Sequence, residues 1–146
     1  MKIRALLTLG VLTLAACHGR PVSQINPLHA AHIAMTDHLL TANMGALQHS
    51  RQWGSASIGD GKHGVDVAVT LDNEPEGASE RAFIAKSNCS KPSSQAWKPL
   101  SPVRSGKSQT HVPGVTVGEM KKGRYAIVVQ QPGTSGRAVS CGDFEL

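Results

Sequence analysis

The residue types best suited to binding a metal ion lie near the start of the chain. His29, His32 and Met35 follow one another closely, and imidazole nitrogens with a thioether sulfur suit copper. In a helix, His32 lies about 60° around the axis from His29 while His38 lies on the opposite face, so three histidines of one straight helix cannot reach one ion. We therefore expect no metal site and no cofactor, and we name His29, His32 and Met35 as the candidate ligands if a site exists.

No complete catalytic set is present elsewhere. The segment SIGDGKH resembles part of a phosphate-binding loop, but His63 follows Lys62 where such loops need serine or threonine. Asp72, Glu74 and Glu76 lie in the turn DNEPEG, where exposed carboxylates are expected. The chain also lacks the Gly-x-Ser-x-Gly pattern of many hydrolases. We expect a protein that is not an enzyme.

The first of the three cysteines, Cys17, ends an apolar leader. Lys2 and Arg4 form a basic start, and the run from Ala5 to Ala16 carries no charge. This run is too short for a membrane-spanning helix, which needs about 20 residues, and it matches the apolar part of a secretory signal peptide. The tetrad Leu14-Ala15-Ala16-Cys17 resembles the lipobox of bacterial lipoproteins.

This resemblance implies cleavage before Cys17 and fatty acyl chains such as palmitate on that residue. Several acyl chains hold a protein stably in a bilayer, whereas one chain binds only marginally. His18 occupies the position where an aspartate favours inner-membrane retention in enterobacterial lipoproteins. The resemblance therefore predicts a cell-envelope protein and favours the outer membrane, on its periplasmic or surface face.

The two remaining cysteines, Cys89 and Cys141, predict a disulfide. An even number of thiols in an oxidising compartment usually forms bridges. The alternative is a pair of metal-binding or reactive thiols, which no CxxC spacing supports.

The charge of the chain is modest. Removal of Lys2 and Arg4 with the signal peptide lowers the net charge of +5 by two. The remaining excess is too small to indicate nucleic-acid binding, and a secreted location also argues against it. Attraction to anionic lipid or to a cell-wall polymer is compatible with this charge.

The elements that would position these residues fall into two parts. Leu28 to Gln48 is rich in Ala, Leu and Met at helical spacing, and Ser50 to Gly64 has the glycines of a loop. From Val65 the apolar residues alternate, as in a half-buried strand, and further short strands with turns between them follow. The expected strands are 65–71, 82–85, 110–117, 125–130 and 137–144.

These patterns predict a mainly β protein, an antiparallel β-sandwich preceded by one helix and a flexible tether. The expected division is a signal peptide over 1–16, a lipid anchor and tether over 17–27, a helical lead-in and loop over 28–63, and a disulfide-closed sandwich over 64–146.

Several short motifs of the C-terminal half resemble the small envelope sandwich domains related to copper/zinc superoxide dismutase. The motifs are GVDVAVTL, AFIAKSNC, SPVRSGKSQT, KKGRYAIVV and SCGDF. The resemblance implies the same disulfide, Cys89 with Cys141. The metal ligands do not carry over, because the strand before Cys89 has no histidine and only His63 and His111 occur in or near this half.

We therefore expect a lipid-anchored envelope lipoprotein with a non-catalytic binding or structural role, which includes service as an accessory part of an envelope assembly. Its partners would be the membrane, through Cys17, and an envelope protein or cell-wall component. Trp53 and Trp97 are candidate binding anchors or covers of the sheet edge. The alternative is a periplasmic metal-binding or divergent dismutase-like protein that uses His29 and His32 with His63 or His111.

Overall fold

The computed structural model describes residues 39–133 and 136–144 of the 146-residue chain. The predicted signal peptide, Cys17, the tether and the candidate ligands His29, His32 and Met35 lie outside the described residues. The elements are β1 (Leu39–Ala46), β2 (Trp53–Gly61), β3 (Gly64–Asp72), β4 (Arg81–Ala85), β5 (Lys98–Pro99), β6 (Lys107–Pro113), α2 (Val117–Met120), β7 (Ala126–Gln130) and β8 (Ala138–Asp143).

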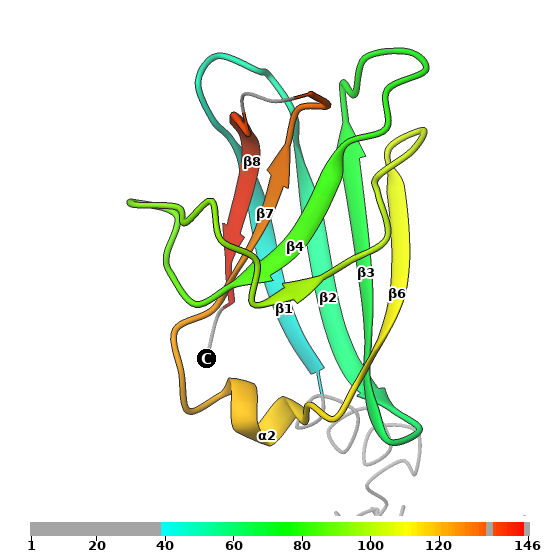
Figure 1. Ribbon diagram of the computed structural model, residues 1–146, viewed down its shortest axis with the longest axis vertical. Helices are drawn as coiled ribbons and strands as arrows, with labels where there is room; N and C mark the ends of the chain where they lie inside the picture. Colours follow the sequence, from blue (N-terminus) through cyan, green and yellow to red (C-terminus); the bar gives the residue numbers. More distant parts are fainter. Residues whose placement is uncertain (1–38, 134–135, 145–146) are drawn as a thin grey trace, which may run out of the picture.

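All eight strands join one antiparallel sheet in the order β5-β4-β7-β8-β1-β2-β3-β6, and this sheet curves into a nearly closed barrel (Figure 1). The prediction of a mainly β, antiparallel protein is confirmed. The strands form one curved sheet where we expected two facing sheets. The reason is β1, which pairs with β2 from Leu39 to Met44 and with β8 through Gly45 and Ala46.

The predicted helix is wrong over its described part, because Leu39–Ala46 is strand β1. Leu40, Ala42 and Met44 are buried and alternate with exposed residues, so the apolar pattern has a period of two here. The leucines, alanines and methionine that suggested a helix also fit this strand. Pairing with β2 and β8 decided between the two.

The predicted loop over 50–64 is also wrong, because Trp53–Gly61 is strand β2. Ala56 and Ile58 point into the core, and small polar residues alternate with them. At Gly54 a glycine is needed because the neighbouring strand β3 leaves no room for a side chain. A Cβ on Gly54 would lie 2.0 Å from the carbonyl oxygen of Thr70 on β3.

The later strands follow the sequence pattern closely. The predicted strand 65–71 is β3, in which Val65, Val67, Val69 and Leu71 are buried. The strands expected over 82–85, 125–130 and 137–144 are β4, β7 and β8, with small shifts at their ends.

The strand expected over 110–117 is instead β6, and it ends at Pro113. The short helix α2 follows it, and the side chain of Thr116 caps this helix by accepting a hydrogen bond from the Glu119 amide.

The core has two parts. The larger part fills the barrel. It receives side chains from both halves of the sheet, β1-β2-β3-β6 on one side and β5-β4-β7-β8 on the other. The smaller part lies on the outer face of β4, β7 and β8 and contains Phe83, Ala126 and Val128, with Ala96 packed against it. Both faces of these strands are therefore buried, because the segment between β4 and β5 covers the outer one.

No helix among residues 39–133 and 136–144 is long and apolar enough to cross a bilayer.

Candidate functional site

The predicted disulfide is present. Cys89 and Cys141 are bonded, with their Cα atoms 5.6 Å apart. Cys89 lies in the segment after β4, Cys141 lies within β8, and the Cys89 amide also donates to Asp143 Oδ1 at 2.9 Å. The bridge therefore holds the covering segment against the small outer core.

A depression of about 590 Å³ lies on the outer face of β1, β2, β3 and β6. Alternate residues of a strand share one face, so the strand register brings this set together from segments far apart in sequence. Leu39, Gly59, Asp66 and His111 form one row across the four strands, and Ser57, Ala68 and Gln109 form most of the next. The side chains in the middle are small, so the surface is hollowed there.

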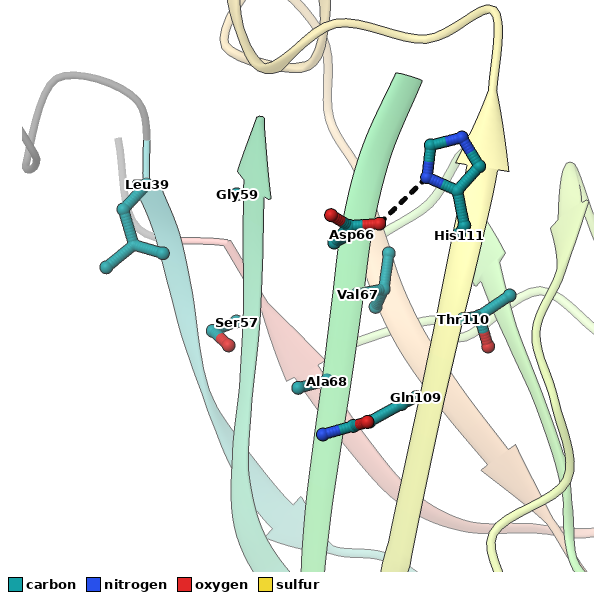
Figure 2. Close-up of a pocket in the computed structure, with 9 residues that line it drawn as sticks. All are labelled: Leu39, Ser57, Gly59, Asp66, Val67, Ala68, Gln109, Thr110 and His111. Carbon is teal, nitrogen blue, oxygen red and sulfur yellow. Dashed lines mark hydrogen bonds and ion pairs between the residues drawn. The ribbon is translucent and has the colours of Figure 1, made fainter. Parts of the chain in front are cut away.

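One ion pair crosses this depression. His111 Nδ1 lies 2.8 Å from Asp66 Oδ1, and the two side chains are 44% and 66% exposed. Figure 2 shows the second ring nitrogen of His111 directed away from the carboxylate. Because both groups are exposed, the pair is expected to contribute little to stability. Its donors and acceptors remain accessible to a polar ligand.

The depression does not assemble a serine nucleophile with a histidine base. Ser57 is on β2 and His111 is on β6, with β3 between them. Two strand spacings separate such positions by roughly 10 Å, whereas a base must lie within about 3 Å of the hydroxyl. Ser57 is therefore too far from His111 for the imidazole to take its hydroxyl proton.

The two histidines of the C-terminal half are not brought to one site. His63 lies in the turn between β2 and β3 and lines another depression with residues 114–118, whereas His111 faces the outer sheet. Asp72, Glu74 and Glu76 line a third depression beside β3. Within the part of the chain that the structure describes, no group of three or more His, Cys, Asp or Glu side chains is placed to hold a metal ion.

A buried polar pair that the sequence did not predict lies near the end of the barrel where β4 begins. Glu80 has no exposed surface, Gln52 is 2% exposed, and Gln52 Nε2 donates to Glu80 Oε1 at 2.8 Å. Glu80 Oε2 and Gln52 Oε1 have no hydrogen-bond partner. No local pattern marks either residue, because they are 28 residues apart in the chain and meet only in the folded barrel.

Burial raises the pKa of Glu80 above its ordinary value, the hydrogen bond from Gln52 acts in the opposite direction, and the charge of Glu74 adds to the rise. Glu80 therefore keeps its proton to a higher pH than an exposed glutamate does. A proton on Oε2 would make that oxygen a donor, which the unpartnered amide oxygen of Gln52 can accept from.

The two tryptophans differ in environment. Trp53 is 56% exposed at the start of β2. Trp97 is partly buried against the main core, with its ring centroid 4.8 Å from that of Tyr125. The ammonium groups of Lys86 and Lys98 lie 4.9 and 5.4 Å from the Trp97 ring, within cation–π range.

Comparisons with protein-family models, with curated proteins and with solved structures found no match to this chain. The resemblance to the dismutase-related domains thus stays a prediction.

Proposed function

We propose that this protein is a lipid-anchored protein of the cell envelope with a non-catalytic binding or structural role, which includes service as an accessory component of an envelope assembly. The observation that carries the proposal is the Cys89–Cys141 disulfide. Such bridges persist in oxidising compartments outside the cytoplasm. The leader before Cys17, with its basic start and its apolar run, would deliver the chain to such a compartment.

The binding surface that we assign is the depression around Asp66 and His111. It offers a carboxylate, an imidazole and the Gln109 amide on a rigid sheet, and its middle is lined by small side chains. Rigid strands hold such groups at fixed spacing, which lowers the entropic cost of binding. Its open shape and mixed polar and apolar lining suit a segment of another envelope protein or a hydroxyl-rich cell-wall component.

The anchor is tested with a Cys17→Ser variant in the native host. We expect wild-type protein in the membrane fraction, with acyl chains on an N-terminal Cys17 in the intact mass, because the thiol carries the lipid. The variant should lack the lipid and keep its signal peptide uncut. Once the leader is removed by an engineered cleavage site, it should move to the soluble fraction.

A Cys89→Ser variant is the matched control, because it removes a thiol without removing the lipid-bearing residue. It should stay in the membrane fraction. An unmodified Cys17 on the mature wild-type chain would refute the proposed anchor.

A further inference from the structure

Three buried side-chain oxygens have no hydrogen-bond partner within residues 39–133 and 136–144. They are Oε1 of Gln52, Oε1 of Glu74 and Oε2 of Glu80. Gln52 and Glu80 are 2% and 0% exposed, and Glu74 is half-buried. Because buried polar atoms of folded proteins almost always have a partner, each of these oxygens needs an explanation.

The fold brings the three side chains to one end of the barrel. Gln52 directly precedes β2, and its Nε2 donates to Glu80 Oε1 at 2.8 Å. Glu74 and Glu80 belong to the β3–β4 loop, and both are held by the segment before β6. The Gly106 amide donates to the Glu74 carboxylate, and Glu80 exchanges two backbone hydrogen bonds with Val103. Glu74 lies close enough to Glu80 for its charge to raise the pKa of Glu80. Figure 1 shows the β3–β4 loop, the turn before β6 and the start of β2 at the same end of the barrel.

The chemistry of these three oxygens suits a cation. Ionised carboxylates and amide oxygens can only accept hydrogen bonds or bind a positive ion. Among the residues that the structure describes, no lysine, arginine or histidine forms an ion pair with Glu74 or Glu80. Carboxylate and amide oxygens are the ligands of hard divalent cations. The set differs from the groups of three His, Cys, Asp or Glu side chains considered above, because its third ligand is the amide of Gln52.

An acidic depression gives access to Glu74 from solvent. Its volume is about 410 Å³, and its described lining includes Asp72, Glu74 and Glu76 but no basic residue. Arg104 and Lys107 lie in the neighbouring turn and do not line the depression. Because a depression lined by one sign of charge raises the local concentration of the opposite ion, it attracts cations toward Glu74.

We propose that Gln52, Glu74 and Glu80 bind one Ca²⁺ ion through their three unpartnered oxygens. Ca²⁺ accepts about six to eight oxygen ligands in flexible geometry, whereas Mg²⁺ needs a near-ideal octahedron and gives up its water reluctantly. Backbone carbonyl groups and water would supply the remaining ligands. The ion would replace the proton that burial favours on Glu80, and it would join the β3–β4 loop to the start of β2. This inference does not depend on the lipid anchor.

The test is calorimetric titration of the full mature protein with Ca²⁺, after a chelator has removed bound metal and at constant ionic strength. We expect one ion per chain with a Kd of about 0.1–1 mM, the range of extracellular calcium modules. Urea unfolding gives a second measurement. At about 10 mM Ca²⁺ the ratio of folded to unfolded protein should rise at least tenfold, as mass action requires for this Kd. An equal rise with Mg²⁺ at the same concentration would overturn the assignment to Ca²⁺.

The test variants are Glu74→Gln and Glu80→Gln, which remove a charged ligand and keep the size of the side chain. Each should weaken Ca²⁺ binding by about tenfold or more, because affinity depends on the number of charged ligands. Glu80→Gln should still fold, since it removes a buried carboxyl group, so its loss of binding would not report misfolding. The matched controls are Asp72→Asn and Glu76→Gln, which remove the same charge from exposed positions of the same depression. They should bind Ca²⁺ within about threefold of wild type, because exposed charges are screened.

Two results would overturn the proposed site. The first is no saturable binding by wild-type protein up to about 10 mM Ca²⁺, well above the expected Kd. Buried water or a proton on Glu80 would then satisfy these oxygens. The second is an equal loss of affinity in all four variants, because it would show a general attraction to the acidic depression and no bound ion at Glu74 and Glu80.

Discussion

Glu80 is a carboxyl group with no exposed surface, and its only side-chain hydrogen-bond partner is an equally buried amide. A charge in such a place is unfavourable unless it is paired. The neutral acid removes the buried charge and turns one carboxyl oxygen of Glu80 into a hydrogen-bond donor. By contrast, the side chains of Asp66 and His111 are exposed. Their importance lies in the polar groups that they offer to a ligand.

A Glu80→Gln variant should show how much the buried carboxyl group of Glu80 lowers the free energy of unfolding. Because the folded-state pKa of Glu80 is raised, its contribution to stability is fully present below its ordinary pKa and is lost as pH rises through the folded-state pKa. The variant should therefore gain free energy of unfolding relative to wild type between pH 4 and pH 8, by about 1–3 kcal/mol, the usual cost of one orphaned buried polar group. Urea unfolding across this range measures the gain.

Glu76→Gln is the matched control, since Glu76 is an exposed residue of the same loop. Because it removes a carboxyl group from an exposed position, it should not reproduce the gain in stability of Glu80→Gln. Parallel pH profiles for Glu80→Gln and wild type would contradict the buried-acid interpretation.

At the scale of elements, the segment between β4 and β5 behaves as a cover for one face of the sheet. Its residues pack Ala96 and Cys89 against the outer cluster of β4, β7 and β8, although it has little regular structure of its own. Two attachments hold its ends: the disulfide and the amide of Trp97, which donates to the Ile84 carbonyl at 2.8 Å.

The double variant Cys89→Ser/Cys141→Ser should lower the free energy of unfolding by about 4 kcal/mol, because the bridge closes a long loop in the unfolded chain. The two cysteines are 52 residues apart. Denaturant unfolding with and without reductant measures this loss. Reductant should destabilise the wild type and leave the variant unchanged, and a variant as stable as oxidised wild type would be inconsistent with this role.

At the scale of the whole molecule, β1 joins the two halves of the sheet. It pairs with β2 over most of its length but with β8 through only two residue pairs. The main core, however, draws residues from both halves: Ile58 and Val65 from one side and Ile84 and Ile127 from the other. Because these residues are buried together, neither half can open without exposing apolar surface of the other.

The two halves should therefore unfold in one step. The chain has two tryptophans, and Trp53 lies on β2 while Trp97 adjoins β5. We expect the single-tryptophan variants Trp53→Phe and Trp97→Phe each to show one urea transition by fluorescence. Each midpoint should coincide with that from far-ultraviolet circular dichroism of the same variant, and two separated midpoints within one variant would contradict a shared core.

The local pattern of the sequence predicted the later strands and the disulfide. In β3, four large apolar residues alternate with Asp66, Ala68 and Thr70, and this period of two fits a strand and no helix. The pairing of Cys89 with Cys141 followed from the number of cysteines once Cys17 was assigned to the lipid. These features need only the chain's own order and composition.

The tertiary structure decided the rest, because the deciding interactions join distant residues. Leu39–Ala46 carries apolar residues at spacings that suit either a helix or a strand, and β2 and β8 supplied the backbone partners that made it a strand. Asp66 meets His111, and Glu80 meets Gln52, only through the register of other strands. A side chain's neighbours across a sheet depend on which strands pair, and this pairing depends on how the whole chain buries its apolar surface.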